Sequence, residues 1–225
     1  MSRLTKSPSF SGLSSLIQGY QKFKAQHFEK KKSYQALVRY GQRPKVLMIA
    51  CCDSRVDPAL IMQCHPGELF VVRNVANLVP PFDQNPRHHS TSAALEFAVK
   101  RLEVTDIIVF GHSHCGGIRA LMENSRDTMN SDFMSAWMDI AQLAKQEVLT
   151  QYPEASIDEK SYHCEKKSLV ISKENLLTFP WIKERVLTQK LFLHAWYFDL
   201  KTGTIETYQN HPDSQFIPLE SILFE

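Results

Sequence analysis

Short, continuous apolar runs recur along the chain, and each predicts a strand that is buried on both faces of a sheet. They lie at residues 45–51, 68–72, 105–110 and 191–200. Between them, apolar residues at helical spacing predict helices over 92–102, 116–123, 132–150 and 165–173, and a further helix that begins near Pro180. A turn at 201–203 leads into a last short strand at 204–209, so these segments form a predicted hairpin.

Strands that alternate with helices indicate a sheet whose strands run mainly in parallel. We therefore expect an α/β fold with a mostly parallel central β-sheet, one antiparallel edge strand from the final hairpin, and flanking helices on both faces. In sheets of this kind, sites form beyond the carboxyl ends of the parallel strands. Cys51 ends the first predicted strand and His112 follows the third, so both should lie at that edge.

The N-terminal segment carries an apolar stripe at helical spacing that runs from Leu13 towards Phe28. The first 28 residues contain no Asp or Glu, a composition that organelle transit peptides share. The stripe continues without a cleavage-like break, which favours an amphipathic helix and a cytoplasmic protein over a transit peptide. We expect residues 1–35 to form a helical arm of a single domain that spans residues 1–225.

The composition excludes several classes of protein. Of 225 residues, 43% are hydrophobic and 22% charged, which is ordinary for a globular protein, and the net charge of +2 is too small to indicate nucleic acid or a membrane surface as a partner. No apolar run is long enough for a spanning helix. Five cysteines, an odd and sparse number, do not resemble a disulfide framework and indicate a reducing compartment.

Three of the polar residues at the predicted sheet edge form a candidate metal site. His112 and Cys115 are two residues apart in GHSHCGG, and Cys51 ends a neighbouring strand. Two sulfurs and one nitrogen suit zinc, and three protein ligands leave the fourth tetrahedral position open, as in catalytic sites. Four residues are less favoured candidates for a fourth ligand: Cys52, Cys64, His65 and His114. We expect Cys52 to be a small buried residue that faces away from Cys51.

Asp53 and Arg55 follow Cys51 closely in CCDSR. The carboxylate can reach a metal or its bound water, and the guanidinium can hold that carboxylate through two hydrogen bonds. A plain salt bridge at a strand end is the alternative, as is direct and inhibitory ligation of zinc by Asp53. Because two thiolates neutralise the ion, we expect its water to be less acidic than at an all-histidine site, and the reaction to work best at alkaline pH.

These residues resemble those of the β-class carbonic anhydrases. The resemblance rests on ACCDSRVDP, PGELFVVRNVANLVPP, SAALEFAV, GHSHCGG and LHAWYFDLKTG, and it extends over nearly the whole chain. It implies that Cys51, His112 and Cys115 bind zinc and that Asp53 and Arg55 form the catalytic dyad. It also implies six substrate-binding residues, with Phe97 at a position that is commonly Tyr: Gln42, Phe70, Val75, Phe97, Gly116 and Gly117.

Met48 stands where the bicarbonate-regulated branch of that family has Trp. Together with Gln42, this favours the plant-like branch with an open active site. The resemblance implies reversible hydration of carbon dioxide to bicarbonate and a proton by a zinc-bound hydroxide. It further implies at least a homodimer with the active sites at its interface, in which the N-terminal arm packs on the partner; dimers of this family frequently associate into tetramers or octamers.

Other functions remain open at this point. The same fold and ligands resemble enzymes that hydrolyse carbon disulfide or carbonyl sulfide. Cys115 could act without metal as a nucleophile activated by His112, and a zinc-stabilised binding protein without activity is a further alternative, which the intact Asp53–Arg55 pair disfavours. No proton shuttle stands out among the candidate histidines, which are His65, His88, His89 and His114.

Overall fold

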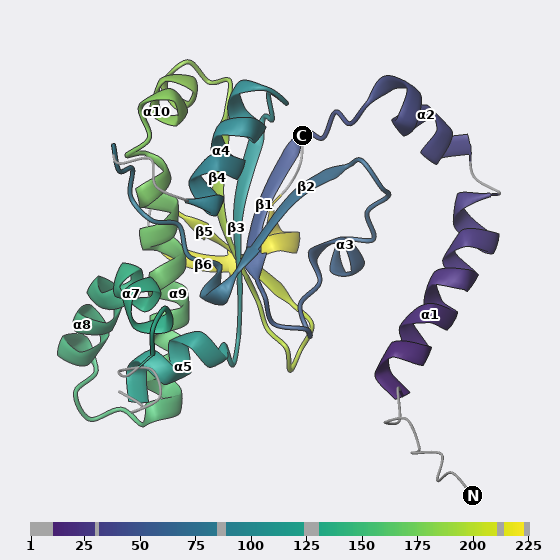
Figure 1. Cartoon of the computed structure of the whole chain (residues 1–225). Coiled ribbons are helices and arrows are strands. Elements are labelled where there is room, and N and C mark those ends of the chain that lie inside the picture. Colours follow the sequence, from purple (N-terminus) through teal and green to yellow (C-terminus); the bar gives the residue numbers. More distant parts are fainter. Residues whose placement is uncertain (1–10, 30–31, 85–88, 124–130, 211–213, 223–225) are drawn as a thin grey trace, which may run out of the picture. The chain divides into compact units, whose positions relative to one another are not determined.

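Figure 1 shows the computed structural model, which describes residues 11–29, 32–84, 89–123, 131–210 and 214–222. The chain divides into two compact units, residues 1–42 and 43–225. The first unit contains α1 (Ser11–Phe23), a π-helical turn (Lys24–Phe28) and α2 (Lys32–Tyr40). The predicted N-terminal helix is therefore confirmed, and its apolar side chains are exposed, Leu16 by 73% and Tyr20 by 63%. That residues 1–35 serve as an arm of one domain stays a prediction.

The second unit is built on a six-stranded sheet with the order β2-β1-β3-β4-β5-β6. The strands are β1 (Val46–Cys51), β2 (Leu69–Asn74), β3 (Asp106–His112), β4 (Phe192–Phe198), β5 (Ile205–Gln209) and β6 (Gln215–Pro218). The pairs β2–β1, β1–β3 and β3–β4 are parallel, as predicted, and this brings the carboxyl ends of the first four strands to one edge. The predicted α/β fold class is confirmed.

The antiparallel side of the sheet is wider than predicted. β5 pairs antiparallel with β4 as expected, but β6 pairs antiparallel with β5, so two antiparallel strands stand at this edge. β6 has only four residues and ends in Pro218, so its sequence carries almost no alternating pattern. In addition, β3 continues two residues beyond the predicted end at Phe110, so His112 belongs to the strand itself.

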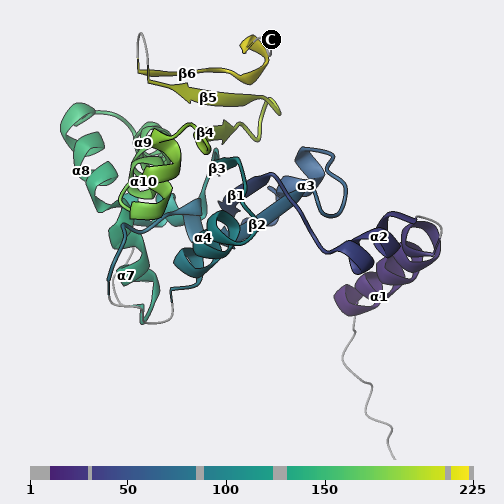
Figure 2. The same cartoon turned by 90° about the horizontal axis from the view of Figure 1, so that it is seen from above.

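Most helices lie on one side of the sheet in both views (Figures 1 and 2). They are α4 (Ser90–Lys100), α5 (Gly116–Glu123), α7 (Met134–Met138), α8 (Gln142–Gln151), α9 (Ile157–Leu176) and α10 (Pro180–Leu187). On the other side of the sheet, the second unit has only the short helix α3 (Pro58–Ile61) among its described residues, capped by Asp57, which accepts from the Leu60 N–H at 3.1 Å. Helices flank both faces of the sheet as expected, but the number of helices differs strongly between the two faces.

Two helix predictions needed correction. The segment 132–150 is not one helix, because a 3₁₀ turn at Asp139–Ala141 separates α7 from α8. The helix predicted over 165–173 is α9, which begins eight residues earlier, at Ile157. Its start is fixed by a capping box in which Ser156 and Glu159 bond each other's backbone N–H groups, a signal that the apolar pattern alone did not include.

Alternation along β1 and β3 divides the core between the two faces of the sheet. Leu47 and Ile49 belong to a buried cluster with side chains of α4 and α9, whereas Met48 and Ala50 pack on the other face with Ile61 of α3. Cys51 continues the first of these rows and so points to the helix-covered side. Within the described part of the chain, no helix is long and apolar enough to cross a membrane.

Gly111 provides a test of how closely β3 packs against α9. A Cβ atom at this position would lie 2.9 Å from Leu169 Cδ1, and Leu169 is fully buried. We expect Gly111→Ala to lower the free energy of unfolding by about 1–3 kcal/mol, measured by urea denaturation. The double variant Gly111→Ala/Leu169→Val should lose less than the sum of the two single changes, because the shorter side chain makes room; strict additivity would contradict the close contact.

Candidate metal centre

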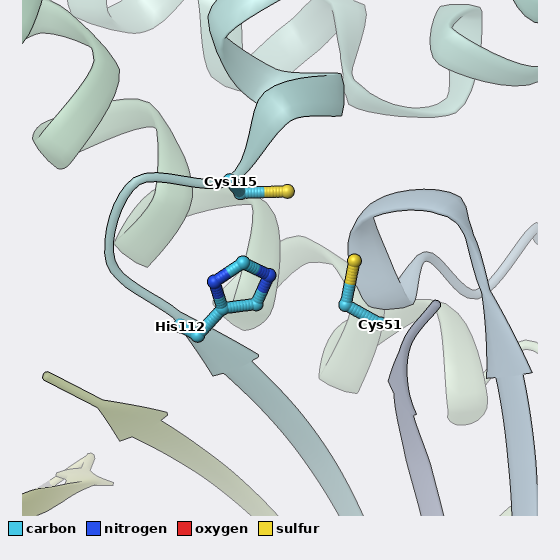
Figure 3. A group of neighbouring side chains, drawn as sticks. All are labelled: Cys51, His112 and Cys115. Atoms are coloured by element: carbon cyan, nitrogen blue, oxygen red, sulfur yellow. The ribbon is translucent and has the colours of Figure 1, made fainter. Parts of the chain in front are cut away.

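Three ligand-type side chains converge at the carboxyl edge of the parallel strands (Figure 3). Cys51 is the last residue of β1, His112 the last residue of the adjacent β3, and Cys115 immediately precedes α5. Their ligand atoms lie within 4.8 Å of one another, and all three residues are buried. The structure therefore confirms that strand pairing brings the two cysteine and histidine motifs together.

The His112 ring is oriented for a metal by the backbone of the next residue, Ser113. Its Nδ1 lies 2.9 Å from the carbonyl oxygen of Ser113, which makes Nδ1 the protonated nitrogen and leaves Nε2 with a free lone pair. In the described structure Nε2 is buried and has no hydrogen-bond partner. A buried acceptor without a partner is costly unless an ion satisfies it, so this atom fits a metal ligand.

The thiols of Cys51 and Cys115 are hydrogen-bonded to each other. A hydrogen bond from Cys115 lowers the pKa of Cys51, and the same contact, together with burial, raises the pKa of Cys115. One negative charge is thus already favoured in the group, and a cation that displaces the second proton is bound by two thiolates and an imidazole. This donor set and its number suit zinc with one open position.

Asp53 and Arg55 form the ion pair that the sequence predicts. Arg55 donates from Nε to Asp53 Oδ1 at 2.9 Å and from Nη2 to Oδ2 at 2.7 Å, and its backbone N–H also reaches Oδ1. This guanidinium holds the pKa of the Asp53 carboxyl well below its usual range. Nη2 of Arg55 further donates to the His114 carbonyl at 3.1 Å. The pair therefore joins the CCDSR loop (residues 51–55) to the HSHC loop (residues 112–115).

Arg73 is a site residue that the sequence reasoning did not single out. It lies on β2 and donates from Nε to the Cys51 carbonyl at 2.8 Å and from Nη2 to the Asp53 carbonyl at 2.7 Å. The backbone on both sides of Cys52 is therefore fixed by one guanidinium. Arg73 directly follows the apolar run that predicts this strand, and a charged residue at the carboxyl end of the strand was the signal that could have revealed it.

Cys52 itself is exposed, so the expectation that it is a buried packing residue was wrong. β1 ends at Cys51, and Cys52 begins the following loop, where its N–H donates to the Asn74 carbonyl at 2.9 Å. The alternation of a strand does not determine its direction there. Among the described residues the metal group contains none of the other candidate ligands, which were Cys52, Cys64, His65 and His114.

The predicted substrate residues fall into two sets. Gly117 lies against Val75, because a Cβ added to the glycine would be 2.9 Å from Val75 Cγ1, and Gly116 opens α5 beside Cys115. Phe70 and Phe97 instead stack on each other with ring centroids 5.8 Å apart. Phe70 is level with Leu47, four residues before Cys51 on the adjacent strand, which places it about 13 Å along the sheet from the metal cluster of its own chain.

The remaining predicted residues are not tested by this geometry. Gln42 ends the first unit, apart from the unit that contains the cluster. Of the candidate proton shuttles, His88 lies outside the described residues, and His114 has a left-handed backbone with φ 57° in the loop between the ligands. The roles of these side chains remain predictions.

The comparison with protein families agrees with the site. A family profile described as carbonic anhydrase matches residues 46–205. The chain is 36% identical over 193 residues to "Beta carbonic anhydrase 3" of Arabidopsis thaliana, which is 85% of this chain and 74% of that relative. It is 42% identical over 168 residues to "Beta carbonic anhydrase 5, chloroplastic" of the same plant, 75% of this chain but 55% of that longer relative. The chain thus spans about half the length of this second relative.

Solved structures share the whole architecture. The β-carbonic anhydrase CcaA superposes with a TM-score of 0.86 at 31% identity over 92% of each chain. A structure from a study of two tetrameric β-carbonic anhydrases of Sordaria macrospora gives 0.75 at 27% identity, over 88% of this chain and 96% of that one. The resemblance seen in the motifs is confirmed, and these relatives favour hydration of carbon dioxide over hydrolysis of carbon disulfide or carbonyl sulfide.

The different surroundings of Cys51 and Cys52 lead to a direct test of the ligand set. We expect Cys51→Ser to lose bound zinc, because the hydroxyl of serine is a poor substitute for a thiolate, whereas Cys52→Ser should retain about one zinc per chain. Metal analysis of both purified variants, with circular dichroism to check folding, measures this. Zinc loss in Cys52→Ser with retention in Cys51→Ser would overturn the assignment.

Proposed function

The chain belongs to the β class of carbonic anhydrases, and we propose that Cys51, His112 and Cys115 hold its zinc while Asp53 and Arg55 orient the attacking water. The protein catalyses the reversible hydration of carbon dioxide to bicarbonate and a proton, with zinc as its cofactor. The observation that carries the residue assignment is the buried Nε2 of His112, which faces two thiols and has no partner within the described structure.

Zinc, when bound, supplies a Lewis acid that makes water nucleophilic at a pH at which free water is not. Asp53 controls the direction of that water. Oδ1 accepts two hydrogen bonds from Arg55 and Oδ2 accepts one, so a lone pair of Oδ2 remains to accept a proton of the attacking water. Because Arg55 keeps the pKa of Asp53 low, this carboxylate is a weak base, and its role is to orient the water rather than to remove its proton.

The apolar residues proposed for the carbon dioxide pocket do not all come from one place in the chain. Val75, Gly116 and Gly117 border the cluster of their own chain, whereas Phe70 and Phe97 lie further along the sheet, where Phe97 is 45% exposed. We propose that Phe70, Phe97 and Gln42 complete the site of a partner subunit in a homodimer. The exposed apolar face of α1 supports such an assembly, since an uncovered stripe of this kind needs a surface to pack on.

Assembly beyond a dimer and cellular location are also proposed. Relatives from Sordaria macrospora are tetrameric, which supports a dimer of dimers here. We propose the cytoplasm as the location because the apolar stripe of α1 has a structural use, although one relative is chloroplastic. Fractionation of cells that express the full chain, with immunodetection of the size of the protein, tests this: a shortened form inside an organelle would contradict it.

Replacement of Asp53 tests the orientation role. Asp53→Asn keeps the side-chain shape but loses the charge, and we expect kcat/KM for carbon dioxide hydration to fall about 10- to 100-fold while zinc content stays unchanged. Stopped-flow hydration across pH measures it, with Asp139→Asn, an exposed carboxylate outside the site, as control. In the wild type, activity should rise towards alkaline pH without an inflection from Asp53, because its pKa lies below the whole range tested.

Mixed dimers test whether the pocket is shared between subunits. Asp53→Ala and Gln42→Ala chains, co-expressed with different tags and purified through both, give dimers in which one site combines an intact Asp53 with the partner's intact Gln42. We expect this mixed dimer to be more active than either parent homodimer in stopped-flow hydration. If Gln42 acts on the zinc of its own chain, both sites stay impaired, and activity no higher than the mean of the parents would contradict the shared pocket.

A further inference from the structure

The buried side chain of Glu165 contacts the backbone of the metal ligand Cys115. Glu165 of α9 accepts the backbone N–H of Cys115 through Oε1 at 2.9 Å and the hydroxyl of Tyr197 through Oε2 at 2.7 Å. Both residues are almost fully buried, Glu165 being 5% exposed and Tyr197 1%. We propose that Glu165 is a positioning residue that fixes Cys115 for zinc, and that Tyr197 holds Glu165 in place.

The position of Cys115 explains why its backbone needs an external partner. Cys115 immediately precedes α5, so its N–H is among the donors at the helix start that have no acceptor within the helix. The residue is buried, which keeps water from taking that place. Glu165 supplies the acceptor from a helix fifty residues further along the chain. Glu165 thereby helps to set the direction of the Cys115 peptide, whose carbonyl accepts the Arg119 N–H and whose Sγ accepts the N–H groups of Gly117 and Ile118.

The other residues of the HSHC loop are held by different partners. The N–H of Ser113 donates to the Phe198 carbonyl at 2.9 Å, and Ser113 Oγ accepts from the Leu200 N–H at 2.8 Å. The carbonyl of His114 accepts from Arg55. Each loop residue therefore has its own tie to a different element, and Glu165 provides the one at the ligand itself.

A pocket of about 510 Å³ borders the loop, and its lining includes Ser113, His114, Gly116, Glu165 and Tyr197. Cys115 itself packs in a buried apolar cluster with Val56 and Ile118. On the side of the pocket, hydrogen bonds hold the loop backbone, and the bond from the Cys115 N–H to Glu165 is one of them.

Tyr197 is itself rigidly placed. Its ring meets Tyr162 edge-on with centroids 5.9 Å apart, and the Lys166 ammonium lies 5.0 Å above it. Lys166 is tied in turn to Glu206 of β5 at 2.6 Å. The series of contacts Lys166–Tyr197–Glu165–Cys115 thus connects the antiparallel side of the sheet to the metal ligand. Glu165 is therefore held by residues that are themselves held in place.

The test compares variants that keep or remove the acceptor. Glu165→Gln retains an oxygen for the Cys115 N–H and an amide that can donate to Tyr197, whereas Glu165→Leu removes both contacts at similar size. We expect Glu165→Leu to bind zinc about 10- to 100-fold more weakly in a competition titration with a chelator, and Glu165→Gln to stay within a few-fold of the wild type. Cobalt substitution adds an independent readout, because the sulfur-to-cobalt absorption band should shift in Glu165→Leu but not in Glu165→Gln.

Ser172→Ala is the matched control. Ser172 is another buried side chain of α9, and it accepts the backbone N–H of Val79 at 3.2 Å, a contact of the same kind that does not involve the metal loop. The Ser172→Ala variant should have a lower melting temperature without a change in zinc affinity or in the cobalt band. A merely structural role of Glu165 would produce the same pattern in Glu165→Leu, and that result would overturn the proposal.

If Glu165→Leu does not fold, a second variant tests the same set of contacts. Tyr197→Phe keeps the ring and its contacts but leaves Glu165 Oε2 without its donor, and we expect a several-fold loss of zinc affinity with a smaller shift of the cobalt band. Wild-type affinity and spectrum in Tyr197→Phe, combined with a Glu165→Leu chain that cannot be purified folded, would also overturn the proposal. The inference rests on the proposed zinc site, and the wild-type titration tests that site separately, since it must show about one metal per chain with a cobalt–thiolate band.

Discussion

Parallel pairing of β1 with β3 is the constraint on which the metal centre depends. The register places Ala50 opposite Phe110, so Cys51 and His112 end adjacent strands within one residue of the same level. A shift of the register by one residue would move one ligand along the sheet relative to the other and turn the buried side chains of one strand to the opposite face. The large buried side chains of both strands oppose that shift, because Leu47, Ile49, Ile107 and Val109 fill the helix-covered core and Met48, Ala50, Ile108 and Phe110 fill the other face.

The loops that follow these strands are held by polar contacts in addition to packing. Arg73 binds the carbonyls of Cys51 and Asp53, Arg55 joins Asp53 to the His114 carbonyl, and Glu165 receives the Cys115 N–H. The guanidinium groups of Arg73 and Arg55 bring a charge to their bonds, which makes these bonds stronger than bonds between neutral groups. A site in which two thiolates and an imidazole must meet one ion needs such directional fixing, because a densely packed wall would close the open coordination position.

The parts of the structure that follow periodicity were predictable, and the parts set by tertiary contacts were not. The strands β1, β2 and β3 and the helices α4 and α5 have strong apolar patterns, and the cluster of Cys51, His112 and Cys115 follows from their order along the chain. β6 has only four residues, which is too short to carry a pattern, and the 3₁₀ turn between α7 and α8 preserves the buried stripe that suggested one helix. The prediction for Cys52 was wrong because β1 ends at Cys51, and the alternation of a strand does not set the direction of a side chain in the loop that follows. The roles of Arg73 and Glu165 were not predicted because each side chain contacts backbone atoms far away in the sequence, which no local spacing reveals.

The distribution of the site residues separates metal binding from substrate binding. All three ligands and the Asp53–Arg55 pair come from the carboxyl edge of one sheet, so a single chain holds the full metal group. The stacked pair Phe70–Phe97 lies about 13 Å further along that sheet, beyond the reach of any rotamer change towards its own cluster. If these rings line a carbon dioxide pocket, they do so for another chain, and an isolated chain binds zinc without a complete pocket. Assembly would then limit catalysis while leaving metal affinity untouched, a separation that follows from the sheet register alone.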